Sequence, residues 1–404
     1  MSNKSILLYV PVPLFQSQDG YLLEDQACNG LHLWAENFSS LTVLIPVEHG
    51  PPPPSWKPIE TVGANSDRIR IVPLPTAYRP DQFLKCYRAT RDIISDEIDK
   101  ADYLSFAIGG LIGDWGSVGS YLAYRKGRPY AVWTDRVESE VVRRSASTGS
   151  FKRRLKARLM HRPMAWSERY LIKRAALGLF HGKETFDTYA PYCKQPELVH
   201  DIHIKKSDHI APDQLEGKMA QATGGPLKIG YIGRADPMKG PLDWIEVLGG
   251  LAARGVDFEA FWMGEGSELE AMEARISELE LGERVKLLGF VKDRAQVLET
   301  YRETQCFLFC HKTPESPRCL IEALVSGTPI VGYHGAFAEN LIASHGGGRL
   351  VAMDDVAALT DQLEVLARDR TVLAGLISAA AKDGEPFEDE EVFRHRSDVI
   401  KQYL

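Results

Sequence analysis

Short apolar runs alternate with longer segments of helical periodicity along most of the chain. In the first half, runs at residues 6–10, 41–45, 68–72, 103–108, 130–134 and 177–180 predict strands, and residues 24–37 and 82–100 predict helices between them. Strands that alternate with helices are typical of an α/β fold with a parallel sheet. The pattern therefore predicts a doubly wound N-terminal domain.

The alternation stops at a polar, glycine-containing stretch near residues 211–226 and then resumes. The second half predicts strands at 228–232, 258–263, 285–288, 306–310 and 330–333, and helices at 241–253, 268–278, 295–301, 317–325 and 388–403. We expect an N-terminal domain over residues 1–207, a linker over 208–226 and a second domain over 227–385. The last segment, 386–404, is expected to return to the first domain.

Composition supports two globular domains and narrows the class of protein. The chain has 404 residues, 44% hydrophobic and 25% charged, with a net charge of −7 that argues against general nucleic-acid binding. There is no apolar run long enough to span a membrane, and the first ten residues are interpreted as a strand and not as a signal peptide. Six scattered cysteines indicate reduced thiols in a cytoplasmic protein.

Cys306, Cys310 and His311 lie close together in the sequence and resemble a metal cluster at first sight. The two cysteines belong to a short apolar run, and zinc-binding pairs usually have a CxxC spacing with a second pair elsewhere. We interpret the run as a buried strand and predict no metal site.

The first predicted strand of the second domain is followed by a loop suited to a diphosphate. Gly233 permits a tight turn, Arg234 and Lys239 supply two cations, and Pro241 suits the first position of the next helix. A helix N-terminus beside two cations attracts phosphate oxygens.

A second loop of this kind precedes the predicted helix at 317–325. Ser316 is expected to cap the helix, which leaves the backbone N–H groups of Arg318 and Cys319 available for an anion or a sugar oxygen. Glu315 lies before the helix, and Glu322 lies inside it among apolar neighbours, where a carboxylate needs a partner. Such a carboxylate can accept two hydrogen bonds from the vicinal hydroxyls of a ribose.

Further along, Gly264-Glu265-Gly266 follows a strand but lacks the third glycine of a dinucleotide fingerprint, which disfavours a dehydrogenase.

Taken in order, the loops and glycine segments of the second half resemble the retaining GT-B glycosyltransferases of family 4, the "group 1" family. The matching segments are 233–240, 264–266, 285–291, the paired glutamates, 327–332 and 346–351. The resemblance covers about residues 227–376 and implies two Rossmann-like domains that face each other across a cleft.

The resemblance also implies roles for individual residues. Arg234 and Lys239 would bind the donor diphosphate, Glu322 the ribose, and Glu315 the transferred sugar. The turn after the 285–288 strand would bring Gly289, Phe290 and Val291 near the base, with Gly233 and Gly264 lining the same site. Six residues separate the two glutamates, whereas the family usually has seven.

The N-terminal domain resembles the family less closely. Gly20 corresponds to the glycine loop that follows the first strand. Asp135 lies at a strand end near the position of a family histidine, and it is interpreted either as an acceptor-cleft residue or as a helix cap.

The implied reaction is transfer with retention, in which the leaving diphosphate takes the acceptor proton and the protein stabilises the charge on that group. The resemblance predicts no cofactor and no metal, with a UDP- or GDP-sugar donor as substrate. Rival interpretations are a nucleotide-sugar epimerase or a phosphorylase on the same fold, and a non-catalytic nucleotide-binding module. Arg234, Lys239 and Glu322 argue against the non-catalytic module.

Residues 143–174 form a basic segment with an apolar stripe and are interpreted in two ways. Phe151, Leu155 and Leu159 recur every four residues, Pro163 is expected to break the helix, and Trp166 and Tyr170 follow. The segment either lies on an anionic membrane or forms a solvated helix over the domain core. In the first case the protein is peripheral on the inner face of the cytoplasmic membrane. The acceptor is then a lipid-linked glycan used to build a cell-surface polysaccharide or glycolipid.

Overall fold

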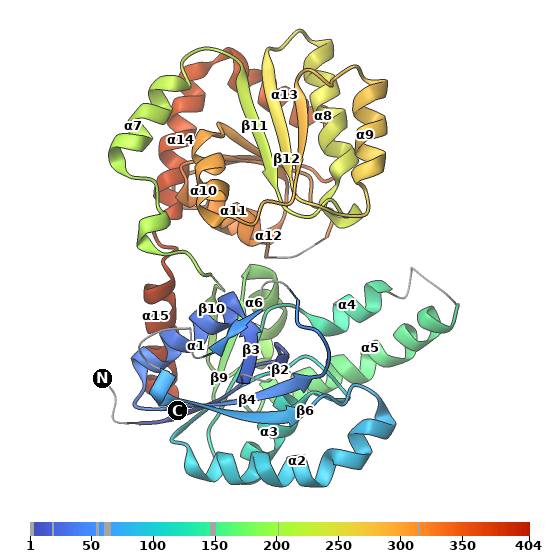
Figure 1. Cartoon of the computed structure of the whole chain (residues 1–404), viewed down its shortest axis with the longest axis vertical. Coiled ribbons are helices and arrows are strands. Elements are labelled where there is room, and N and C mark those ends of the chain that lie inside the picture. Colours follow the sequence, from blue (N-terminus) through green and yellow to red (C-terminus); the bar gives the residue numbers. More distant parts are fainter. Residues whose placement is uncertain are drawn as a thin grey trace. The chain divides into compact units, whose positions relative to one another are not determined.

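The computed structural model describes residues 4–17, 20–53, 56–59, 66–145, 151–200, 202–313 and 316–404. The chain divides into two compact units (Figure 1): residues 1–203 with 389–404 form the N-terminal unit, and residues 204–388 form the C-terminal unit. The last helix, α15 (Asp389–Tyr403), packs against α1 (Asp25–Asn37) in the N-terminal unit.

A mixed sheet forms the centre of the N-terminal unit. Its strands are β1 (Ile6–Tyr9), β2 (Leu14–Ser17), β3 (Gly20–Glu24), β4 (Leu41–Glu48), β5 (Trp56–Pro58), β6 (Ile69–Pro75), β7 (Tyr103–Ala107), β8 (Ala131–Thr134), β9 (Leu177–His181) and β10 (Pro196–Val199). Its other helices are α2 (Pro80–Lys100), α3 (Trp115–Arg125), α4 (Glu138–Ser145), α5 (Phe151–Ile172) and α6 (Lys183–Tyr189). The main order is β10-β9-β8-β7-β1-β4, and β6 pairs with the outer side of β4.

All the strands of that main order are parallel, as the alternating pattern predicts. The exception is an antiparallel extension, in which β3 pairs with both β2 and β5. Gly20 begins β3 and pairs with Ser17, so this glycine belongs to a β-hairpin. A hairpin this short leaves little periodicity in the sequence, and for that reason it was not predicted.

Alternate residues of β1 contribute to two hydrophobic cores. Leu7 and Tyr9 belong to one cluster with Phe106 and Trp115, and Ile6 and Leu8 belong to another. Because successive side chains of a strand point to opposite faces, both faces of this sheet are buried.

The prediction that Pro163 breaks the helix was wrong, because α5 continues through it. Pro163 is exposed. A proline within a helix removes one backbone hydrogen bond, and at an exposed position water can satisfy the carbonyl that is left without a donor.

The C-terminal unit is a smaller sheet with helices on both faces (Figure 1). Its strands are β11 (Leu227–Ile232), β12 (Phe258–Met263), β13 (Val285–Gly289), β14 (Cys306–Phe309), β15 (Ile330–Tyr333) and β16 (Gly348–Val351). Its helices are α7 (Pro212–Gln221), α8 (Pro241–Ala253), α9 (Leu269–Glu278), α10 (Arg294–Glu303), α11 (Arg318–Val325), α12 (Ala336–Leu341), α13 (Val356–Arg368) and α14 (Arg370–Gly384).

The strands of this unit are all parallel, in the order β13-β12-β11-β14-β15-β16. The order reverses between β11 and β14, and open sheets of this kind bind ligands at the carboxyl ends of the strands beside that point. Both units therefore confirm the predicted α/β class with doubly wound parallel sheets.

Two local predictions in the C-terminal half were wrong. Residues 212–221, expected within a linker, form α7, whose buried Lys218 amine donates to Tyr301 O at 3.2 Å, Ser326 O at 2.9 Å and Thr328 Oγ1 at 2.6 Å. Ser316 does not cap α11, because the helix begins at Arg318 with Pro317 in the capping position and no side-chain cap.

Candidate donor and acceptor sites

The loops after β11 and β12 lie against each other at the carboxyl edge of the C-terminal sheet. Gly264 has φ 146°, and a Cβ on it would lie 2.0 Å from the Gly233 carbonyl oxygen. The Gly233 N–H donates to Met263 O at 2.9 Å, and the Trp262 indole donates to Gly233 O at 3.1 Å. The predicted donor glycines are thus neighbours, and only a residue without a side chain fits at position 264.

The loop that carries the two predicted cations is held against the end of β14. Gly240 adopts φ 65°, and a Cβ there would lie 2.1 Å from the Cys310 carbonyl oxygen. The Lys312 N–H donates to Met238 O at 2.9 Å, which is a second contact between this loop and the residues after β14. Strands β11 and β14 flank the point where the sheet order reverses, so this contact places the loop at the expected ligand-binding position.

Arg234 and Lys239 lie in different environments. The Arg234 side chain is 72% exposed and pairs with Asp236 at 3.1 Å, whereas Lys239 is buried. An exposed guanidinium can turn toward an incoming diphosphate, while a buried ammonium supplies fixed positive charge. The arrangement can stabilise negative charge that develops on a leaving diphosphate.

His311, which follows the apolar run 306–310 and was considered in the sequence only as a possible metal ligand, lies next to Lys239. Its Nε2 is 2.8 Å from the Tyr231 hydroxyl. Burial and the nearby Lys239 ammonium hold the pKa of His311 well below its usual range, so the imidazole is neutral at pH 7. The structure therefore adds a neutral, hydrogen-bonding side chain beside the predicted cations.

Glu322 lies on α11 and has the partners that its apolar neighbours led us to expect. Arg294 Nη1 donates to Glu322 Oε1 at 3.0 Å, and the Tyr301 hydroxyl donates to Oε2 at 3.3 Å. Arg294 Nη2 also donates to Asp208 Oδ2 at 3.1 Å. The prediction of a partnered carboxylate is confirmed, and Arg294 is a residue that sequence reasoning missed.

The remaining predicted donor residues follow the same sheet edge. Phe290 comes directly after β13 and is exposed, with Val291 beside it, and Arg318 and Cys319 form the first turn of α11. Glu315 lies outside the described residues. Within the described residues, no group of three or more histidine, cysteine, aspartate or glutamate side chains is arranged to hold a metal ion.

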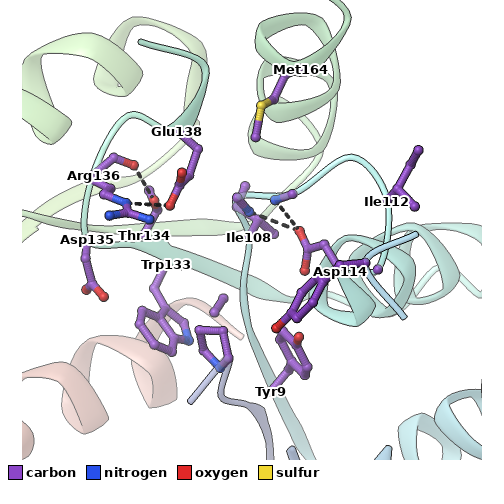
Figure 2. A pocket seen from close by; sticks show the side chains of 16 residues that line it. Tyr9, Ile108, Ile112, Asp114, Trp133, Thr134, Asp135, Arg136, Glu138 and Met164 are labelled. Atoms are coloured by element: carbon purple, nitrogen blue, oxygen red, sulfur yellow. Dashed lines mark hydrogen bonds and ion pairs between the residues drawn. The ribbon is translucent and has the colours of Figure 1, made fainter. Parts of the chain in front are cut away.

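The N-terminal unit contains a cavity of about 520 Å³ at the carboxyl ends of β1, β7 and β8 (Figure 2). Tyr9 ends β1, Ile108 follows β7, and Trp133 and Asp135 lie at the end of β8. Met164 of α5 and the exposed Tyr78 complete the wall. Asp135, a predicted acceptor residue, lines this cavity, whereas Gly20 is not among its lining residues.

Asp114 organises the glycine loop on one side of the cavity. One carboxylate oxygen accepts the N–H groups of Gly109 at 3.0 Å and Gly110 at 2.9 Å and the Ser117 hydroxyl at 2.5 Å. The other accepts the N–H groups of Gly116 at 3.0 Å and Ser117 at 3.3 Å, which caps α3. This aspartate joins two segments of the loop. Sequence reasoning missed it because no motif in the sequence marks these contacts to backbone N–H groups.

Asp135 lies beside a histidine. Its Oδ1 lies 2.8 Å from Nδ1 of the buried His181 at the end of β9. The His181 ring also stacks on Trp133, with ring centroids 5.6 Å apart and an interplanar angle of 23°. Of the two interpretations of Asp135 that the sequence left open, these contacts favour a cavity residue.

Comparisons with known proteins agree with this architecture. Residues 218–383 match the family model described as "Glycosyl transferases group 1". The chain is 27% identical over 214 residues to a 2-deoxystreptamine N-acetyl-D-glucosaminyltransferase of Streptomyces fradiae, with 50% of each chain covered. It is 29% identical over 154 residues to a phosphatidyl-myo-inositol mannosyltransferase of Mycolicibacterium smegmatis, with 38% of this chain and 39% of that one covered. The chain spans about half the length of the curated relatives it matches.

Solved structures resemble the whole chain in fold. HepE of Anabaena in complex with UDP superimposes with a TM-score of 0.68 at 15% identity, covering 99% of this chain and 100% of that one. Sucrose-phosphate synthase of Thermosynechococcus elongatus has a TM-score of 0.68 at 14% identity, covering 99% of each chain. Residues 218–383 therefore resemble the group 1 glycosyl transferases, and the chain has the GT-B fold.

Proposed function

We propose that this protein is a retaining, family 4-type glycosyltransferase that moves a sugar from a nucleoside diphosphate sugar to a glycan or lipid-linked acceptor. The observation that carries the proposal lies in the C-terminal unit. There the glycine loops after β11 and β12, the cation-bearing loop and the partnered Glu322 follow one edge of the sheet, beside the point where the strand order reverses. The family match over residues 218–383 includes all these elements.

In the proposed reaction, each part of this edge has a chemical task. Arg234 and Lys239 hold the diphosphate and stabilise the negative charge it gains as the sugar leaves. Glu322 accepts hydrogen bonds from the ribose, and Phe290 lies near the base. The first turn of α11 contains Arg318 and Cys319, whose backbone N–H groups would contact oxygens of the donor.

The acceptor is proposed to bind in the cavity of the N-terminal unit. A volume of about 520 Å³ matches the range of small-molecule sites, and the aromatic rings of Tyr9, Tyr78 and Trp133 line it. The curated relatives are named for the transfer of N-acetylglucosamine, glucose and mannose, and the HepE structure contains UDP. These names support a UDP-sugar as the first donor to test.

The donor site is tested by calorimetric titration with UDP and with GDP. We expect Arg234→Ala and Glu322→Ala each to weaken binding of the preferred nucleotide at least about tenfold, or ~1.4 kcal/mol. Lys286→Ala, which removes an exposed cation from β13, is the matched control and should bind like the parent protein. Parent-like affinity in both site variants would contradict the assignment.

The reaction itself is tested with a panel of UDP- and GDP-sugars. A glycosyltransferase releases nucleoside diphosphate in proportion to the acceptor supplied, whereas an epimerase isomerises the donor without an acceptor. Retention predicts that the product has the anomeric configuration of the donor, which proton NMR reports. Metal independence predicts that EDTA leaves the rate unchanged, and loss of activity in EDTA would overturn that part of the proposal.

We further propose that α4 and α5 bind the inner membrane surface. The two helices lie side by side and extend away from the sheet (Figure 1). On α5, Leu159 is 65% and Trp166 67% exposed, and the exposed Arg158 and Arg162 flank them. None of the helices in the described part of the chain is long and apolar enough to cross a bilayer. An exposed apolar stripe between arginines matches an anionic lipid surface.

Sedimentation with vesicles of phosphatidylglycerol and phosphatidylcholine tests this surface. The doubly substituted Leu159→Glu, Trp166→Glu protein should stay in the supernatant, and Val365→Glu, at an exposed apolar position of α13, should sediment like the parent. Equal sedimentation of all three proteins, or of none, would refute the membrane role.

A further inference from the structure

The charges on the cavity wall of the N-terminal unit are not equally available to a ligand. The charged lining residues are Asp114, Asp135, Arg136 and Glu138. Asp114 uses both oxygens to accept five donors of its own loop and of α3. Glu138 accepts the Arg136 guanidinium at 2.6 Å, so these two charges neutralise each other.

Asp135 is the remaining acidic residue of these four, and its environment differs from those of Asp114 and Glu138. Its side chain is 53% exposed, and its contact is an imidazole and not a guanidinium or ammonium. The buried His181 ring stacks on Trp133, and its Nδ1 lies 2.8 Å from one carboxylate oxygen of Asp135 without forming a hydrogen bond to it. The second oxygen is then available to the cavity that Asp135 lines.

The cavity wall beside Asp135 is aromatic. Trp133 lies next to Asp135 on one side, and Tyr9 lies across from them near Asp114 (Figure 2). Aromatic faces bind the apolar faces of sugar rings and also attract cations. An anionic carboxylate beside such a wall recognises a positively charged group on a polyhydroxylated ring.

We propose that this cavity binds an acceptor ring that carries a protonated primary amine, as in an amino sugar or an aminocyclitol, with Asp135 as its counter-ion. The inference rests on the proposed function, because it treats the cavity as the acceptor site. It adds the charge of the acceptor. A protonated amine forms an ion pair with Asp135, whereas a neutral or N-acetylated sugar donates only uncharged hydrogen bonds to it and therefore binds less tightly.

Binding of matched monosaccharides at pH 6.5 tests the proposal. Ligand-observed NMR titrations of the full chain use methyl α-D-glucosaminide, methyl α-D-glucoside and methyl N-acetyl-α-D-glucosaminide. We expect the glucosaminide to bind at least about tenfold more tightly than either neutral glycoside. Equal affinities for the three glycosides would overturn the proposal.

Asp135→Asn keeps the shape of the side chain and removes its charge, so it should abolish the preference for the amine and leave affinity for the neutral glycosides unchanged. Asp187→Asn, at an exposed carboxylate of α6 that pairs with Lys183, is the matched control and should keep the preference. A preference that survives Asp135→Asn would assign the amine to another group and refute the inference.

The same samples separate this inference from the proposed function. UDP is titrated into each protein, since the donor residues lie in the other unit. Absence of an amine preference in the parent protein, with normal UDP binding, counts against the acceptor inference alone. Amine preference without UDP or GDP binding counts against the donor assignment alone. The circular dichroism melting curve of Asp135→Asn confirms that the variant is folded.

Discussion

At the scale of single residues, Arg294 holds the Glu322 carboxylate in an ion pair. Arg294 bridges Glu322 and Asp208, whose side chains are 18% and 14% exposed. Arg294→Met would leave two largely buried carboxylates without their cation, which is destabilising. We expect a loss of about 1–3 kcal/mol in the free energy of unfolding and weaker nucleotide binding, measured by urea denaturation and calorimetry.

Arg275 supplies the matched control for that substitution. It also pairs with two carboxylates, those of Glu246 and Glu278, but these are 41% and 63% exposed. Exposed ion pairs contribute about 0–1 kcal/mol. Arg275→Met should therefore shift the urea midpoint little and leave nucleotide affinity unchanged. Equal losses in the two variants would mean that Arg294 acts only as an ordinary surface ion pair.

His200 predicts a pH dependence of stability in the N-terminal unit. Burial, with a contribution from His181, lowers the pKa of His200 to about 4. Below its ordinary pKa near 6.5 the unfolded chain takes up a proton that the folded chain does not, so stability is lost as the pH falls from about 6.5 to 4. The loss from this residue amounts to about 3 kcal/mol at completion.

Urea denaturation at pH 7.5 and pH 4.5 checks this expectation. His200→Gln removes the titrating group, so the variant should lose less stability than the parent over this interval. The carboxylates that titrate in the same range are common to both proteins and cancel in the comparison. A parallel pH dependence in the two proteins would show that His200 is protonated equally in the folded and unfolded chains.

At the scale of elements, the loops after β11 and β12 depend on close backbone approach. Gly264→Ala places a methyl group 2.0 Å from the Gly233 carbonyl oxygen and requires a φ that alanine disfavours. We expect at least about 2 kcal/mol of destabilisation and a severe loss of UDP binding. Gly282→Ala, where a Cβ meets nothing within 4 Å, should change neither quantity.

Helix α7 shows why the linker prediction was wrong. Its sequence is polar because most of it is exposed, and that composition is also typical of a linker. Lys218 instead joins it to Tyr301, Ser326 and Thr328, and burial lowers the pKa of this lysine well below its ordinary range.

Lys218→Met tests whether these hydrogen bonds stabilise the C-terminal unit. It removes one donor from each of three acceptors inside the unit, and we expect a loss of about 2–3 kcal/mol in the urea-denaturation free energy. Glu216→Met, on the exposed side of the same helix, should stay within about 0.5 kcal/mol of the parent. Similar values for the two variants would contradict the structural role of Lys218.

At the scale of the whole molecule, each unit has its own sheet and its own buried core. A ligand that binds one folded unit stabilises that unit by mass action, by about 2.7 kcal/mol at one hundred times its Kd. We expect saturating UDP to slow hydrogen exchange in the strands of the C-terminal unit, near Trp244 and Trp262. Slowing confined to the N-terminal strands would contradict the placement of the donor site.

The sequence alone determined most of the elements and the sheet edge on which the proposed donor residues lie. A buried strand is recognised in the sequence by a short apolar run, and a loop by its glycines, cations and prolines. Both patterns consist of residues that are close together in the chain. Gly233, Gly264 and Glu322 were found in this way. The need of Glu322 for a partner was also readable from its apolar neighbours.

Only the tertiary structure decided which groups meet. Arg294 with Glu322 and Asp135 with His181 come from separate elements, and their pairing depends on how those elements are arranged in the sheet. The Lys218 contacts likewise span more than eighty residues. A hydrogen bond depends on distance in space, and local periodicity records only whether a side chain is buried, not what it contacts.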